Sequence, residues 1–148
     1  MRLGVPKEPS NETRVAIVPS SMKKLLKSGF EVLVEKGAGI SANYSDSDYE
    51  NAGAKIVSRK EALSCENIIC INFPGVDGIG EKTNLACVAD PFRNPEYVKQ
   101  CMESKITLMS MDMIPRRLSR AQSMDVNSSQ DNLAGYKAVL LGAANVPK

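Results

Sequence analysis

The stretch that determines the fold is Glu31-Val32-Leu33-Val34-Glu35, a short apolar run that is polar only at its ends. An unbroken apolar run of this length is typical of a strand buried on both faces of a parallel sheet. Further short runs rich in apolar residues are also predicted to be strands, at 3–5, 55–57, 68–71, 85–89 and 106–109. The chain therefore encodes six short strands.

Helical patterns separate these strands. A proline near the first position and a glycine after the last bound a predicted helix at 19–28. Shorter helices are expected at 46–52 and 59–64, and a further one follows Asn94, which is predicted to be its N-cap. The glycine-rich segment 75–82 is expected to be a loop or a single helical turn.

The last helix is predicted over 129–144, with Ser128 and Asp131 forming a capping box at its start. Strict alternation of strands and helices predicts a doubly wound α/β fold of the Rossmann or flavodoxin-like kind. It should have a largely parallel sheet with helices on both faces. The length of 148 residues is that of a single domain.

Composition excludes several classes of protein. The net charge of +2 is too small for an electrostatic nucleic-acid binder. No apolar window approaches the ~18 residues of a membrane span, and the N-terminus turns polar too soon for a secretory signal. We therefore expect a soluble, cytoplasmic protein.

The chain has four cysteines without a CxxC pair, and it has no histidine. Cysteines inside apolar runs, such as Cys70 and Cys87, are expected to be free and buried in the core. We expect no metal site. The absence of histidine removes the commonest general base and zinc ligand.

Two loops that follow strands carry polar chemistry, at the sheet edge where such folds bind ligands. The first is 6–14, whose alternating charges indicate either a solvated loop tied by local ion pairs or an anion clamp built on Arg14. No glycine pattern completes the GxGxxG fingerprint of a dinucleotide-binding turn, and we interpret the glycine pairs at 37–39 and 78–80 as turns.

The second loop, 115–125, contains three arginines together with Gln122 and Asp125. It could be an exposed basic turn. Alternatively, an arginine, the Gln122 amide and the Asp125 carboxylate could converge on one polar ligand. A glutamine offers both a donor and an acceptor, whereas an ionised aspartate only accepts, and that pair can hold a carboxamide.

The sequence resembles the N-terminal domain of the alanine dehydrogenase and nicotinamide nucleotide transhydrogenase family over essentially its whole length. The resemblance is carried by residues 1–8, by Asn11-Glu12-Thr13-Arg14-Val15-Ala16, by 29–39, and most specifically by Ser119-Arg120-Ala121-Gln122-Ser123-Met124-Asp125 and 128–136. The transhydrogenase branch is the nearer one. Alanine dehydrogenases carry a substrate lysine at the position of Asn72 and a catalytic histidine after the fifth strand, and this chain has neither.

This resemblance implies the N-terminal lobe of the NAD(H)-binding component of proton-translocating NAD(P) transhydrogenase, which orients NAD(H) for hydride transfer to NADP. It assigns cofactor contacts to Arg117, Gln122 and Asp125, with Ser128 nearby, and no catalytic residue. Counting from Pro115 selects Arg116 instead of Arg117, because one additional residue intervenes here; we favour Arg117. The family lobe is expected over 1–128, and the start of a connector helix over 129–148.

The resemblance also implies a second NAD-binding lobe, which is expected to lie outside these 148 residues, and NADP-binding and membrane subunits as partners, with a homodimer possible. The chain would then lie in the cytoplasm at the periphery of a membrane complex. It would be inactive alone and would bind NAD(H) weakly. Two alternatives remain open: a non-catalytic module that binds a small anion or assists assembly, and the substrate domain of an amino-acid dehydrogenase.

Overall fold

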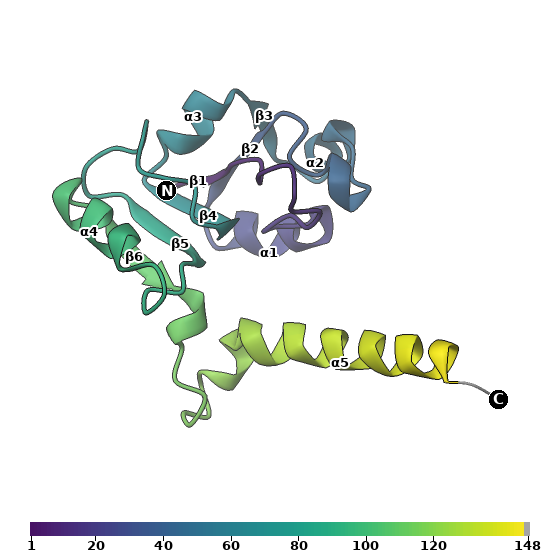
Figure 1. Cartoon of the computed structure of the whole chain (residues 1–148). Helices are drawn as coiled ribbons and strands as arrows, with labels where there is room; N and C mark the ends of the chain where they lie inside the picture. Colours follow the sequence, from purple (N-terminus) through teal and green to yellow (C-terminus); the bar gives the residue numbers. More distant parts are fainter. Residues whose placement is uncertain (147–148) are drawn as a thin grey trace. The chain divides into compact units, whose positions relative to one another are not determined.

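The computed structural model describes residues 1–146, and a parallel six-stranded sheet forms the centre of its first compact unit, Met1–Ser110 (Figure 1). The strand order is β3-β2-β1-β4-β5-β6, and every adjacent pair is parallel. The strands are β1 (Arg2–Val5), β2 (Glu31–Glu35), β3 (Lys55–Val57), β4 (Asn67–Asn72), β5 (Asn84–Val88) and β6 (Thr107–Ser110). All six predicted strands are confirmed, with bounds that differ by at most one residue.

Helices cover both faces of this sheet, as the doubly wound pattern predicts. They are α1 (Met22–Lys27) after the 3-10 turn η1 (Pro19–Ser21), α2 (Asp46–Asn51) after η2 (Ile40–Ala42), α3 (Arg59–Leu63) and α4 (Pro95–Glu103). Strand β2 shows the two faces directly. Val32 and Val34 pack with Met22 of α1 and Tyr49 of α2, whereas Leu33 packs in a second core with α3 and α4 residues.

The strand order places a topological switch point between β1 and β4. From β1 the chain proceeds outward through β2 to β3, and it then returns to β4 and proceeds the other way to β6. The loops that leave β1 and β4 therefore diverge at the carboxyl edge of the sheet. In open α/β sheets this is the place where ligands bind.

Gly4 of β1 allows α3 to lie directly against the sheet. A Cβ at this position would overlap the backbone carbonyl oxygen of Ala62 in α3. A backbone atom cannot move aside as the end of a flexible side chain can. The glycine is therefore required where β1 passes beneath α3, and it allows the end of α3 near Ala62 to pack directly on the strand.

Residues 111–146 form a second compact unit after Met1–Ser110. This unit contains the 3-10 turns η3 (Met111–Met113) and η4 (Gln122–Met124) and the long helix α5 (Val126–Asn145). Although the last helix was predicted, its predicted start and capping box were wrong. The helix begins three residues earlier, because the Asp125 side chain accepts a hydrogen bond from the backbone N–H of Ser128 and acts as the N-cap.

The other capping prediction was also wrong in its detail. Asn94 stands at the N-cap position of α4, but its side-chain amide donates to the carbonyl oxygens of Ala89 and Asp90 and does not cap the helix. The segment 75–82 contains only turns and bends, so it is a loop.

The four cysteines are free and buried, which confirms the core interpretation. Within residues 1–146, no helix is long and apolar enough to cross a membrane.

Candidate functional site

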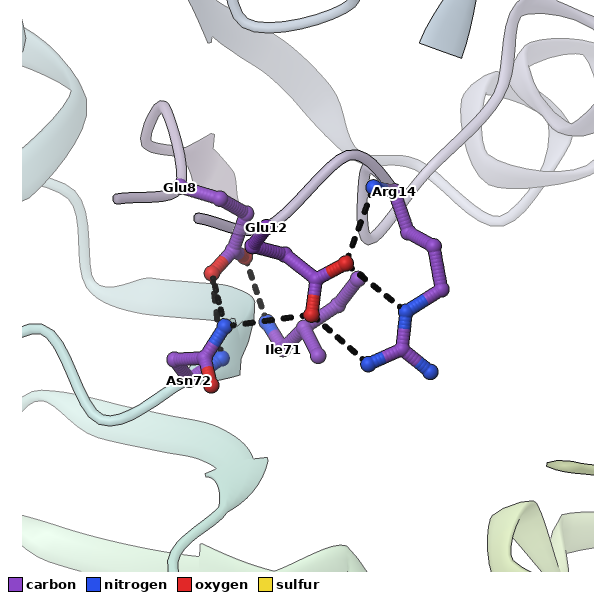
Figure 2. Close-up of polar contacts among 5 residues, drawn as sticks. All are labelled: Glu8, Glu12, Arg14, Ile71 and Asn72. Carbon is purple, nitrogen blue, oxygen red and sulfur yellow. Dashed lines mark hydrogen bonds and ion pairs between the residues drawn. The ribbon is translucent and has the colours of Figure 1, made fainter. Parts of the chain in front are cut away.

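Glu8, in the loop after β1, is the centre of a polar cluster at the switch point (Figure 2). Its Oε1 accepts the backbone N–H of Ile71 at 2.5 Å, and its Oε2 accepts the backbone N–H of Asn72 at 3.0 Å and the Asn72 side-chain amide at 3.1 Å. The residue is only 8% exposed. We refer to Glu8, Glu12, Arg14 and Asn72 as the Glu8 cluster.

The Glu8 carboxylate takes the place of a neighbouring strand. Pairing between β1 and β4 is limited to Leu3 with Asn67 and Gly4 with Ile68, and the pairing of β4 with β5 shifts register between Ile69 and Asn72. Two successive backbone N–H groups would then need other acceptors, and a buried unpaired group costs about 1–3 kcal/mol. Glu8 supplies both acceptors and thereby ties the loop after β1 to the end of β4.

Glu12 and Arg14 form the outer part of the cluster. Glu12 accepts from the Arg14 Nε at 2.9 Å and from its Nη2 at 2.7 Å, and it also accepts the Arg14 backbone N–H. These hydrogen bonds, first of all those of the guanidinium, lower the pKa of Glu12 to about 2. The Asn72 amide reaches Glu12 as well, at 3.4 Å.

The interpretation of segment 6–14 as a solvated loop tied by local ion pairs is therefore right for Glu12 and Arg14 and wrong for Glu8. Local pairing of charges describes Glu12 and Arg14. It does not describe Glu8, which is buried and bound to residues more than sixty positions away. The Arg14 guanidinium was the candidate for an anion clamp. In the structure its Nε and Nη2 donate hydrogen bonds to the Glu12 carboxylate.

The second polar loop, residues 115–125, is called the arginine loop below. Asp125 is its best-anchored member. The Oδ1 atom accepts the Ser128 backbone N–H at 3.0 Å, and Oδ2 accepts the Ser128 hydroxyl at 2.6 Å. The Ser128 hydroxyl is the main reason that the pKa of Asp125 is lowered. Asp125 thus fixes the end of the loop to the first turn of α5.

Arg116 is the arginine that lies near this carboxylate. Its Nε is 3.5 Å from the Asp125 Oδ2, and its Nη2 is 3.6 Å from the Asp131 Oδ2. Arg117 and Gln122 are exposed, and neither side chain makes a hydrogen bond or ion pair with the residues that the structure describes. Of the four residues assigned to the cofactor, the structure joins Asp125 and Ser128, while Arg117 and Gln122 face solvent.

The donors and acceptors of the arginine loop fit a nicotinamide nucleotide. Gln122 has an exposed amide that can both donate to and accept from a carboxamide. The Asp125 carboxylate accepts two hydrogen bonds from Ser128 and lies 3.5 Å from the Arg116 Nε, so a ribose hydroxyl would share this carboxylate with Ser128 and Arg116. No group of three or more metal-ligating side chains occurs among residues 1–146.

The fold and the loop together define a class: a Rossmann-like α/β domain with a parallel sheet, a polar switch-point cluster and a separate polar loop capped onto a helix. The model of the alanine dehydrogenase/PNT N-terminal domain matches residues 4–134. The chain belongs to this family.

Relatives within the family carry the transhydrogenase name. The chain is 40% identical over 147 residues to NAD(P) transhydrogenase subunit alpha of Haemophilus influenzae, with 97% of this chain and 28% of the relative covered. It is 35% identical over 151 residues to NAD(P) transhydrogenase subunit alpha of Cereibacter sphaeroides, with 98% of this chain and 29% of the relative covered. The chain thus spans less than a third of the length of either relative.

A solved structure agrees with this assignment. The crystal structure of transhydrogenase from Sinorhizobium meliloti superposes on all of this chain with a TM-score of 0.93 and 36% sequence identity. This chain covers 46% of that one. The predicted family and the Rossmann-like architecture are both confirmed.

Proposed function

We propose that this chain is the N-terminal lobe of the NAD(H)-binding component of a proton-translocating NAD(P) transhydrogenase, in which it helps to orient NAD(H) for hydride transfer to NADP. The observation that carries the proposal is the 40% identity to a transhydrogenase subunit alpha over 97% of the chain. The matched family domain, at residues 4–134, also includes the whole arginine loop.

The arginine loop supplies the cofactor contacts in this proposal. The Gln122 amide hydrogen-bonds the carboxamide of nicotinamide, and Asp125 accepts from the adjacent ribose with Ser128 holding its carboxylate in place. Arg117, which is free of protein partners among residues 1–146, extends toward the cofactor, while Arg116 stays with Asp125 and Asp131. NAD(H) itself supplies the hydride, so the residues of this chain position it and need not act as acid or base.

The chain alone should bind NAD(H) only weakly, because one loop provides a small fraction of the contacts that fix a dinucleotide. We propose that a second NAD-binding lobe supplies the remainder, whether on the same polypeptide or on another. Titration of NADH into this chain by calorimetry should give no saturation at micromolar concentrations. A micromolar dissociation constant would contradict this aspect of the proposal.

The proposal also implies partners. NADP-binding and membrane subunits would complete the enzyme, with this chain on its cytoplasmic periphery, and a homodimer is compatible with the proposal. A partner gene that encodes a GxGxxG domain and membrane helices beside the gene for this chain would support it. The stretch of the chain that the structure describes contains no such helix.

Reconstitution tests the proposal directly. The chain is mixed with a separate NAD lobe and an NADP-binding subunit, and hydride exchange between the nucleotides is followed by absorbance. We expect exchange to depend on the addition of this chain. Exchange that proceeds equally well without it would overturn the proposal.

Alanine oxidation is the less favoured function in the family. Asn72 donates its amide to Glu8 and Glu12, so the position that carries a lysine in alanine dehydrogenases is occupied by a neutral side chain already bound within the protein. The chain also has no histidine to act as the acid and base of that reaction.

A further inference from the structure

The loop after β5 lies at the same edge of the sheet as the Glu8 cluster. Strands β4 and β5 are parallel, and Val88, the last residue of β5, is paired with Asn72, the last residue of β4. The chain therefore leaves both strands at the same level of the carboxyl edge, where open α/β sheets bind ligands. Residues 89–94 connect β5 to α4, and we refer to them as the Phe92 loop.

A strained but well-anchored backbone supports the Phe92 loop. Asp90 has a φ of 43°, which a residue with a side chain rarely adopts. Its carbonyl oxygen accepts hydrogen bonds from the backbone N–H groups of Arg93 at 3.0 Å and Asn94 at 2.9 Å, and from the Asn94 side-chain amide at 3.2 Å. The same amide donates to the Ala89 carbonyl oxygen at 3.1 Å. Such strain persists only where the surrounding contacts fix the backbone, so the conformation of this loop is defined before any partner binds.

This fixed backbone holds an aromatic side chain out into solvent. Phe92 is 84% exposed, the highest value among the exposed large hydrophobic residues of 1–146. Single exposed apolar residues are common and by themselves indicate nothing. An aromatic side chain on an ordered loop is different, because it offers a large apolar area and loses little conformational entropy when a partner covers it. The Arg93 side chain beside it is 85% exposed, and aromatic residues and arginine are enriched among the residues that dominate binding at protein interfaces.

The chemistry of hydride transfer determines which partner approaches this edge. The reacting atoms must come within about 3–3.5 Å of each other. The protein that holds NADP therefore has to close on the surface that presents the nicotinamide of NAD(H). In an open parallel sheet that surface is the carboxyl edge, so the partner covers loops at this edge.

We propose that Phe92 anchors the NADP-binding subunit, which receives the ring in an apolar hollow of its surface. Arg93 meets a carboxylate at the rim of that hollow. Its Nη1 lies 3.5 Å from the Asp90 Oδ2, and an exposed pair of this kind contributes little and can exchange for another carboxylate. This role depends on the proposed function and adds to it a residue that binds the partner and not the cofactor.

The test is hydride exchange in the reconstituted mixture, followed while the NADP-binding subunit is titrated at saturating concentrations of both nucleotides. Phe92→Ala should raise the concentration of that subunit at half-maximal exchange about tenfold, as expected for loss of an aromatic anchor. The rate at saturating subunit and the KM for NADH should remain those of wild type. An unchanged half-maximal concentration, or a change confined to the KM for NADH, would overturn the proposal.

Matched variants separate the anchor from general effects. Met102→Ala removes another apolar side chain, 73% exposed in α4, and should exchange as wild type does. Phe92→Leu should restore much of the binding, since an apolar body remains. The urea midpoint of Phe92→Ala should equal that of wild type because the ring is exposed. Equal weakening by Met102→Ala would mean that the partner does not select the Phe92 loop, which contradicts the proposal.

The same experiment distinguishes failure of the anchor from failure of the proposed function. Absence of exchange with the wild-type chain would overturn both, whereas wild-type exchange with an unaffected Phe92→Ala variant would overturn the anchor alone. Sedimentation of the chain by itself tests a second copy as the occupant. We expect wild type and Phe92→Ala to sediment alike. A wild-type dimer that Phe92→Ala dissociates would assign the ring to a homodimer interface and overturn the proposal.

Discussion

The Glu8 cluster and the arginine loop contain the same kinds of side chain but use them in opposite ways. In the Glu8 cluster the carboxylates are bound by donors of the protein, and Glu8 is 8% exposed. In the arginine loop, Asp125 is bound to Ser128 and Arg116 lies near Asp125 and Asp131, while Arg117 and Gln122 are exposed and make no hydrogen bond or ion pair with the described residues. Residues that satisfy one another hold a scaffold together, and residues whose donors and acceptors remain available can recognise a ligand.

This difference assigns distinct roles to the two regions. The Glu8 cluster should determine stability and the shape of the switch point, with little direct effect on cofactor contacts. The arginine loop should contribute little to stability and most of the binding chemistry. Single substitutions can test the role of the Glu8 cluster and the role of the arginine loop separately.

Glu8→Ala should have the largest effect on stability, about 3 kcal/mol, because it leaves the backbone N–H groups of Ile71 and Asn72 without acceptors in a buried place. Urea unfolding followed by circular dichroism measures this change. The control is Glu50→Ala, which removes an exposed carboxylate of α2 and should change stability by less than about 0.5 kcal/mol. Equal stability of the two variants would contradict the structural role of Glu8.

Asp125→Ala should destabilise the start of α5 by about 1 kcal/mol, because the helix loses its N-cap. Asp125→Asn should retain the cap, since asparagine caps helices about as well as aspartate does. Amide hydrogen exchange at Ser128 and Ser129 measures the helix start. If asparagine frayed the helix as much as alanine, the charge of Asp125 and not its capping oxygen would be responsible.

Glu12→Gln should have the smallest effect, no more than about 1 kcal/mol, because its partner Arg14 has a half-exposed side chain. The folded-state pKa of Glu12 is about 2, below the ordinary value of 4.5. Its ionised form therefore stabilises the fold fully above pH 4.5, and this contribution is lost as the pH falls from 4.5 toward 2.

Urea midpoints at about pH 6 and about pH 3, on either side of the ordinary glutamate pKa, measure this dependence. Wild type should lose more stability between the two pH values than Glu12→Gln does. The control Glu50→Gln should behave as wild type, since the Glu50 carboxylate is exposed. An unchanged pH dependence in Glu12→Gln would mean that the pairing with Arg14 does not persist in solution.

The sheet could be predicted well from the sequence because each strand is encoded locally. Runs such as Glu31–Glu35 are apolar on both faces, and only a doubly covered strand satisfies that pattern. The strand order also follows the connection rules of doubly wound folds. Boundaries were less certain where two capping signals overlap, as Asp125 and Ser128 show.

The role of Glu8 could not be predicted from the sequence. It depends on a shift of register in β4, more than sixty residues away, and no local pattern marks a carboxylate that will be buried there. Its charged neighbours in the loop favoured a solvated interpretation. The polar residue types of the arginine loop marked it as a candidate site, whereas the family resemblance supplied the cofactor and the choice of Arg117 and Ser128. Their contacts with a cofactor stay a prediction.

The most direct test of the central claim is the effect of Gln122→Ala on reconstituted hydride exchange between NAD(H) and NADP(H). We expect exchange to fall about tenfold, as loss of one positioning hydrogen bond of about 1.4 kcal/mol implies. Stability should remain unchanged, and the control Gln100→Ala should exchange as fast as wild type. Exchange by Gln122→Ala as fast as that of wild type would contradict the claim that the arginine loop orients the cofactor.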